Sequence, residues 1–181
     1  MRFSLASTAF ALAAAQEGLY TYNTLDFSLG LDPPISDLTT VQYNTMIAGI
    51  AWGFTEQEGL VGIEACVKDA KTEALLAWDA FVHLNHGEWA AGMIEIKNIV
   101  ADLPNLEYTC THIGPDIAIL EAWVLNLEAQ PDIEAYIKSR VKRHIIALTA
   151  DLATARSLYA QGEYFKFGVE LGIMGSIATN K

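Results

Sequence analysis

Apolar side chains recur three and four positions apart along most of this chain, a spacing that places them on one face of an α-helix. The pattern predicts an all-α fold, a bundle of about six helices. The longest predicted helix covers 131–159, with an apolar stripe of Ile133, Ile137, Val141, Leu148, Leu152, Ala155 and Tyr159. The other predicted helices cover 36–54, 55–84, 88–103, 115–127 and 163–179.

Capping and turn residues set the expected helix boundaries. Asp37 is the expected cap of the first helix, and Thr55 with Glu58 has the capping-box form that would start the second. Gly87 and Gly162 are expected to end the two long helices. The second helix has an apolar stripe of Ile63, Val67, Ala70, Ala74, Ala77, Phe81 and Leu84, and the fourth one of Ile117, Leu120, Trp123, Val124 and Leu127.

A weak internal repeat relates two parts of the chain. Gly-Glu-Trp at 87–89 aligns with Gly-Glu-Tyr at 162–164, a shift of 75 positions (162 − 87 = 75), and a helix is predicted before and after each. The repeat predicts two αα-hairpins with glycine at the turn, the two halves of the bundle. With so few identities, a chance similarity is the alternative.

The segment before the helices follows a different pattern. Between 25 and 32 apolar and polar residues alternate strictly, with four apolar side chains on one face, Leu25, Phe27, Leu29 and Leu31. Such alternation is typical of a half-buried strand, yet nothing later in the chain alternates in the same way to pair with it. We expect an extended arm over 16–35 that lies on a neighbouring copy; the alternative is a segment lying across its own helices.

The first fifteen residues resemble a secretory signal peptide. A basic residue at position 2 is followed by an apolar run that ends in three alanines at 13–15. We therefore expect a signal peptide over 1–15, the arm over 16–35 and a helical domain over 36–181, in a secreted, extracellular protein. An uncleaved first helix is the alternative.

The chain contains two cysteines, Cys66 and Cys110. In an oxidising compartment the simplest arrangement is one disulfide between them. Closing a loop of 44 positions (110 − 66 = 44) would stabilise the fold by about 4 kcal/mol in the chain-entropy model. Two buried free thiols are the alternative.

Composition excludes several classes of protein. The chain of 181 residues has 22 acidic and 11 basic side chains and a formal net charge of −11, which argues against binding to nucleic acid. No apolar run approaches the roughly 18 residues of a membrane span, so no transmembrane helix is expected. With 52% hydrophobic residues, the chain is unusually apolar for a lone monomer, so part of its surface is expected to be covered.

Five short motifs follow one another over 46–181: the glycine-containing apolar segment 47–54, Cys66-x-x-Asp69, Gly87-Glu88-Trp89, Leu103-Pro104-x-Leu106-x-x-x-Cys110, and Gly162-Glu163-Tyr164-Phe165-x-Phe167-Gly168 with Gly172. In this order they resemble a family of small secreted two-cysteine proteins of ciliates and related protists. The resemblance implies an extracellular, all-helical, disulfide-bonded domain. It implies no catalytic residue, because no activity is assigned to that family.

Motifs that carry enzyme chemistry are missing from the sequence. It contains no GxSxG, HExxH, Walker or GxGxxG motif, so we expect no enzyme, no catalytic residue and no cofactor. His83, His86 and Glu88 are the nearest approach to a metal-ligand set. A polar helix end that satisfies free carbonyl groups explains the same residues, and no metal site is predicted.

A group of four basic residues, Lys138, Arg140, Lys142 and Arg143, contrasts with the acidic remainder of the chain. Such charge separation suits contacts between identical copies, although a solvated basic face is the alternative. We therefore predict a structural subunit of an extracellular homopolymer or filament, linked through the N-terminal arm, with other copies of itself as partners. The alternative function is a monomeric secreted helical carrier of lipid or another apolar ligand.

Overall fold

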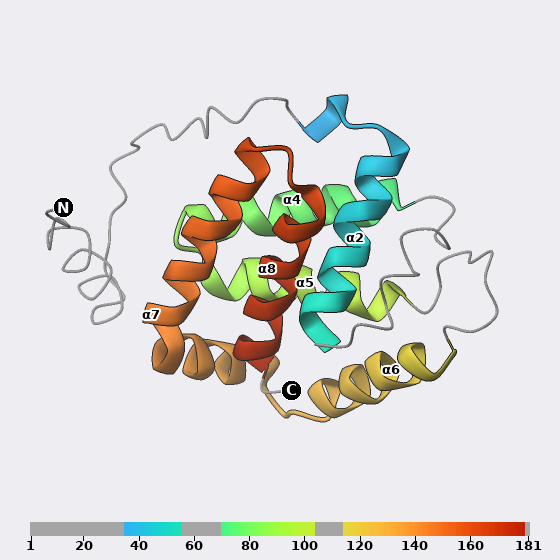
Figure 1. Ribbon diagram of the computed structural model, residues 1–181. Helices are drawn as coiled ribbons and strands as arrows, with labels where there is room; N and C mark the ends of the chain where they lie inside the picture. Colours follow the sequence, from blue (N-terminus) through green and yellow to red (C-terminus); the bar gives the residue numbers. More distant parts are fainter. Residues whose placement is uncertain (1–34, 56–69, 104–113, 180–181) are drawn as a thin grey trace, which may run out of the picture.

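The computed structural model describes residues 35–55, 70–103 and 114–179 of the chain, and within these ranges it contains six α-helices and no strand (Figure 1). The all-α prediction is therefore confirmed for the described part of the chain. A short 3-10 helix, η1 (Ile35–Asp37), comes first. The α-helices are α2 (Thr40–Thr55), α4 (Lys71–Asn85), α5 (Trp89–Asp102), α6 (Gly114–Glu128), α7 (Ile133–Ala160) and α8 (Tyr164–Thr179).

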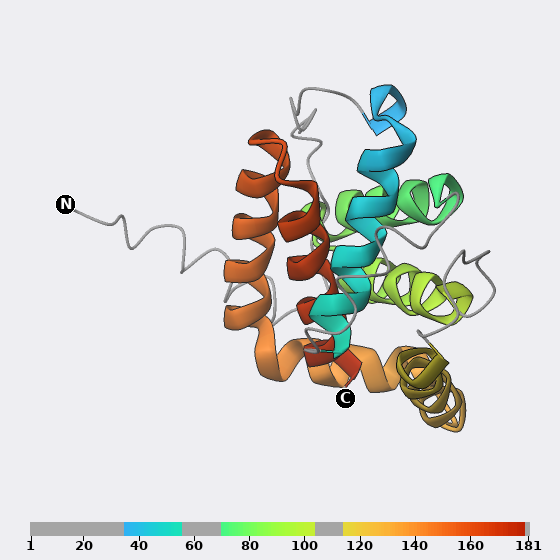
Figure 2. The same ribbon diagram turned by 45° about the vertical axis from the view of Figure 1, so that its right-hand side comes forward.

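The described helices form two layers. Helices α2 and α8 lie side by side with the second half of α7, while the α4–α5 hairpin crosses behind them and α6 lies at one end (Figure 1). Figure 2 shows the same arrangement from the side, with α7 at the outer edge. The core sits between the layers, because each helix turns its apolar stripe toward the other layer.

Two αα-hairpins share one turn geometry, as the repeat predicts. Gly87 and Gly162 have φ angles of 76° and 74°, in the left-handed region that favours glycine. The N–H of Gly87 donates to the carbonyl oxygen of Leu84 (3.1 Å), and the N–H of Gly162 donates to that of Tyr159 (2.9 Å). The next residue in each turn donates to the carbonyl oxygen five positions back, Glu88 to His83 and Glu163 to Leu158, which completes a Schellman motif in both.

Glycines bring α2 and α8 into backbone contact. A Cβ at Gly168 would lie 2.0 Å from the carbonyl oxygen of Met46, and one at Gly172 would lie 2.3 Å from that of Ile50. Gly49 and Gly53 meet the α8 backbone in the same way, at 2.1 Å each. Since the contacts advance together along both helices, α2 and α8 run in the same direction with no side chain between them.

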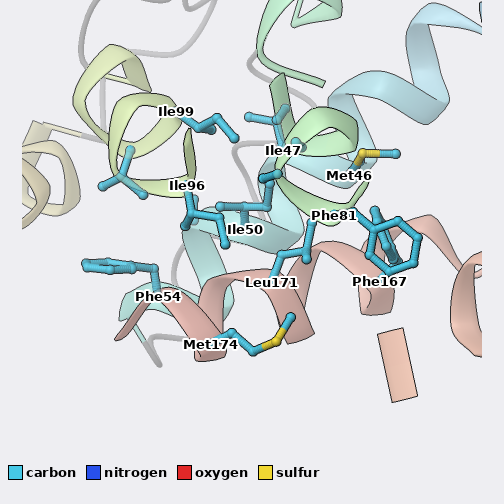
Figure 3. Close-up of a cluster of buried hydrophobic side chains, with 14 of the residues drawn as sticks. Met46, Ile47, Ile50, Phe54, Phe81, Ile96, Ile99, Phe167, Leu171 and Met174 are labelled. Carbon is cyan, nitrogen blue, oxygen red and sulfur yellow. The ribbon is translucent and has the colours of Figure 1, made fainter. Parts of the chain in front are cut away.

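The core is built from the facing stripes of α2, α4, α5 and α8. Figure 3 shows its centre, where the labelled side chains are Met46, Ile47, Ile50, Phe54, Phe81, Ile96, Ile99, Phe167, Leu171 and Met174. Tyr159 adds an aromatic cluster at the edge of this core, with ring centroids 4.8 Å from Trp78, 5.5 Å from Tyr164 and 5.2 Å from Phe167. Burial raises the pKa of the Tyr159 hydroxyl above its usual range.

The first helix begins four residues later than predicted, at Thr40 and not at 36. The helix α2 starts at Thr40, and its cap is Thr39 rather than Asp37. The N–H of Gln42 donates to the Thr39 hydroxyl (3.3 Å), and the N–H of Thr39 donates to Gln42 Oε1 (2.7 Å), a reciprocal capping box. The prediction missed this T-x-x-Q signal.

The second predicted helix, over 55–84, is also wrong as one continuous element. Thr55 is the last residue of α2, and its hydroxyl donates to the carbonyl oxygen of Ala51 (2.8 Å). At the other end, Ala70 has a non-helical backbone (φ −122°, ψ 26°) and stands just before α4. The side chain of Asn44 on α2 accepts the Ala70 N–H (3.1 Å) and caps α4 from a distance.

Candidate functional site

Helix α7 carries the four basic residues that the sequence suggests for contacts between copies, and this helix is bent. Its first half runs along one end of the bundle and its second half stands beside α8 (Figure 1, Figure 2). The helix contains no proline or glycine, but side chains bond to its backbone: Arg143 Nε donates to the Ser139 carbonyl (3.3 Å) and the Thr149 hydroxyl to the Ile145 carbonyl (2.7 Å). Such bonds compete with the helical ladder and bend a helix.

The four basic residues of α7 do not form one uniform surface. Arg140 is half-buried and its Nη2 donates to the carbonyl oxygen of Ile177 (3.2 Å), at the end of α8. Its guanidinium therefore serves a contact within the subunit. Lys138 is exposed and pairs with Glu134 (2.6 Å), and the hydrogen bond and charge of Glu134 raise the pKa of Lys138. Lys142 and Arg143 are exposed.

Two aromatic residues also form hydrogen bonds with the end of α8. The Tyr136 hydroxyl donates to the carbonyl oxygen of Thr179 (3.2 Å), and Trp123 Nε1 donates to the Thr179 hydroxyl (3.2 Å). The last carbonyls of a helix have no partner within the helix, so Tyr136 and Arg140 satisfy groups that would otherwise be left open. We call this set, Trp123, Tyr136 and Arg140, the α8 clasp. Sequence reasoning missed it, because its members lie on different helices.

The second half of α7 presents an uncharged outer face. After Arg143, in a stretch that the structure describes throughout, the exposed side chains of α7 carry no charge, and the charged Asp151 and Arg156 are half-buried. We call these residues the α7 outer face: Ile146, Ala147, Ala150, Ala153, Thr154, Ser157 and Ala160. The largest of them, Ile146, is 71% exposed, the highest value among the four large apolar side chains that the described residues expose.

A pair of carboxyl groups lies between α7 and α8. Burial raises the pKa of Asp151 on α7. Burial, and after it the negative charge of Asp151, raise the pKa of Glu170 on α8. Both shifts disfavour the ionised form, so this pair opposes the packing of the two helices at neutral pH.

Two of the possible metal ligands at the first hairpin turn contact each other instead. Nδ1 of His83 contacts Oε2 of Glu88 across the turn, while His86 is exposed beside them. Among the residues that the structure describes, no three His, Cys, Asp or Glu side chains come together in a way that would hold a metal ion.

The remaining predictions from the sequence fall on other residues. Cys66, Cys110, the signal peptide and the arm with Leu25, Phe27, Leu29 and Leu31 lie outside the described residues. In the described part of the chain, none of the helices combines the length and the apolar character that crossing a membrane requires.

Comparisons with known proteins give no assignment. No family model, curated protein or solved structure matches this chain. The resemblance to secreted two-cysteine proteins of protists therefore stays a prediction.

Proposed function

We propose that this protein is a secreted structural subunit that assembles with copies of itself into an extracellular polymer. The observation that carries the proposal is the α7 outer face, an uncharged, exposed surface that includes Ile146 on a chain of net charge −11. A surface without charge on a strongly acidic protein lets identical copies approach without repelling each other there.

The N-terminal arm supplies the main link between subunits in this proposal. The C-terminal end of the arm is attached to the helical domain, because the Tyr43 hydroxyl donates to the carbonyl oxygen of Ile35 (2.8 Å) and Leu38 is buried. From that point 20 residues (35 − 16 + 1) reach about 66 Å when extended, whereas the helical body should be about 40 Å across. The arm is thus long enough to lie on a neighbouring copy with its four apolar side chains.

Light scattering and negative-stain imaging of the native secreted protein test the proposal. Large regular particles are expected, and deletion of 16–31 is expected to abolish them while circular dichroism still reports a helical body. A native protein that is monomeric at high concentration would contradict the proposal. A monomer that purifies with bound lipid would favour the carrier of an apolar ligand instead.

Secretion has a separate test in the two cysteines. If Cys66 and Cys110 pair, mass spectrometry of the native protein shows no alkylatable thiol before reduction, and reduction lowers its thermal stability. Two alkylatable thiols in the native protein would contradict the oxidising compartment that the proposal requires.

A further inference from the structure

We infer that the apolar segment 25–31 of one copy binds along the seam between α2 and α8 of a neighbouring copy. The inference rests on the proposed assembly through the N-terminal arm, and it adds the surface that receives the arm. Its basis is a row of apolar side chains on the side of α8 that no described helix covers (Figure 1).

Helix geometry places this row on the open side of the bundle. Phe165, Val169 and Ile173 are half-buried and follow one another four positions apart. Two positions along a helix correspond to a rotation of about 200°, so the row lies opposite the buried Phe167 and Leu171. These two side chains face Phe81 of α4 and the other core residues in Figure 3. The row therefore faces away from the α4–α5 hairpin, on the side of α8 that Figure 1 shows in front.

Trp52 of α2 extends the row across the seam. Its ring centroid lies 6.4 Å from that of Phe165, and both side chains are half-buried. A Cβ at the neighbouring Gly53 would lie 2.1 Å from the carbonyl oxygen of Val169, so the two helices leave no gap between their apolar side chains. We call this surface the α2–α8 open face: Trp52, Phe165, Val169 and Ile173.

Charge favours the α2 side of the row as the place for the arm. Helix α2 carries no charged residue. On the α7 side stand Lys166, which pairs with Glu163 (3.2 Å), and Glu170, which lies close enough to Asp151 for its pKa to be raised by that charge. The alternating segment of the arm contains two aspartates and no basic residue, so the carboxyl groups on the α7 side repel it.

The alternating pattern of the arm matches the α8 row in spacing. In an extended chain the side chains on one side recur about every 6.6 Å, and positions four apart on a helix recur about every 6 Å. Over three steps the two rows therefore stay within about 2 Å of register. The four apolar side chains of the arm can then contact the open face, while the polar residues between them remain in solvent: Leu25, Phe27, Leu29 and Leu31.

The attachment point of the arm allows this contact. The carbonyl oxygen of Ile35 accepts a hydrogen bond from Tyr43 near the start of α2 (2.8 Å). From Ile35 an extended chain reaches Leu31 at about 13 Å and Leu25 at about 33 Å, so the segment can lie on a copy next to this end of the molecule. The arm and the open face are different surfaces, so each copy gives one arm and receives one. Such head-to-tail contacts continue into a filament or close into a ring.

Photo-cross-linking in the full chain tests the contact. p-Benzoylphenylalanine in place of Phe27 keeps an aromatic side chain there and bonds to a nearby C–H group on irradiation. Mass spectrometry is expected to locate the bond on Trp52 or within 165–173. The matched control carries the same group at Ser28, which lies on the opposite side of an extended chain and gives no bond to this surface. Equal yields from the two positions, or no bond to the open face from position 27, would overturn the inference.

Isotope labelling shows which copy receives the arm. Light and isotopically heavy chains are mixed in equal amounts before assembly and then irradiated. If the arm lies on a neighbour, about half of the cross-linked pairs join one chain of each kind. Cross-links found only within single chains would show that the arm lies on its own subunit, and the inference would be wrong.

Substitutions on the open face test its part in the assembly. Ile173→Glu places a charge in the row and is expected to lower the yield of cross-links between copies at least about tenfold, whereas Ala153→Glu on the α7 outer face leaves it unchanged. Ile173→Ala only shortens the side chain, and it should lower the yield by a smaller factor even if the charged variant fails to fold. Circular dichroism reports folding. An undiminished yield in both folded Ile173 variants would contradict the inference.

The outcomes separate this inference from the proposed function. Large particles in which position 27 cross-links to another part of the neighbour support the polymer and overturn the open face as its acceptor. Dimers that cross-link at the open face and never form larger particles support this inference and overturn the polymer. A monomer at high concentration overturns both.

Discussion

Two helix faces of this molecule are lined by small residues, and they have opposite surroundings. Between α2 and α8 the small residues are glycines, and each lies against the backbone of the other helix. On the α7 outer face they are mainly alanines, and they are exposed. The difference in residue type has a physical reason, because glycine weakens a helix by about 1 kcal/mol relative to alanine.

A glycine in a helix is therefore retained where a permanent neighbour needs the space of its missing side chain. Four of the five glycines of α2 and α8 fit this case, since each lies against the backbone of the other helix. Alanine has the highest helix propensity, so it strengthens α7 without needing a neighbour at that face. The glycines therefore mark a permanent contact in the core, whereas the alanines of the α7 outer face lie against no described helix.

The largest expected effect breaks the fixed contact. Gly168→Ala would place a Cβ 2.0 Å from the carbonyl oxygen of Met46, so α2 and α8 must separate along their length. We expect the free energy of unfolding to fall by about 3 kcal/mol, measured by urea denaturation. The control is Ala147→Leu on the α7 outer face, where a larger side chain meets water and the change stays within about 0.5 kcal/mol. Equal losses in the two variants would contradict the comparison.

Much of the fold could be predicted because its signals are local. The bounds of α5, α7 and α8 agree with the prediction within two residues, since a glycine turn precedes α5 and separates α7 from α8. At the start of α7, Asp132 Oδ1 accepts the Ala135 N–H (2.9 Å) and caps the helix one residue after the predicted start. The buried stripe of α4 was also predicted, from Ala74 to Leu84. These features depend on neighbouring residues in the chain, which a sequence pattern records directly.

Other features could not be predicted because residues far apart in the chain create them. The start of α4 depends on Asn44, 26 positions before Ala70, so the local pattern read as a continuing helix. Arg140 looked like part of a surface charge group because the end of α8, 37 positions later, gives it a partner only in the fold. The α7 outer face has no local signal, because small and polar residues at outward positions are common on any solvent-exposed helix.

The second prediction concerns the α8 clasp, which holds the end of α8, one of the two helices in backbone contact. Arg140→Ala removes a charged hydrogen bond to the Ile177 carbonyl and the packing of the arginine stem. We expect a loss of about 2 kcal/mol in the free energy of unfolding. Lys142→Ala, at an exposed basic residue two positions along, should change it by less than about 0.5 kcal/mol. If the two variants are equally stable, the clasp does not stabilise α8.

The third prediction tests the turn at Gly162, which joins α7 to α8. In Gly162→Ala the φ angle of 74° strains the new side chain, although no atom of the described structure lies within 4 Å of the added Cβ. Strain of about 1 to 2 kcal/mol is partly offset by the lower entropy of the unfolded chain, so the net loss is about 1 kcal/mol by thermal or urea unfolding. Gly162→Asn should cost less, since asparagine tolerates this conformation. A neutral Gly162→Ala variant would contradict the strained turn.

The smallest expected effect concerns two carboxyl groups, Asp151 on α7 and Glu170 on α8. Both pKa values are raised in the folded protein, so the folded state holds these protons more tightly than the unfolded state. Their contribution to stability is therefore largest at acidic pH and is lost as the pH rises through the folded pKa values. Glu170→Gln removes one charge and should make the protein more stable at pH 7, by less than about 1 kcal/mol because both groups are partly solvated.

The pH dependence of the Glu170→Gln variant shows whether the lost charge is the cause of its higher stability. The advantage of Glu170→Gln over the natural chain should shrink as the pH falls toward 4.5, because Glu170 itself becomes protonated there. Glu134→Gln is the matched control of opposite sign: Glu134 pairs with Lys138, so its loss destabilises the protein at pH 7. Urea denaturation of the three proteins at several pH values measures both effects. An advantage of Glu170→Gln that persists unchanged at acidic pH would show that packing between α7 and α8, and not charge, limits stability at this boundary.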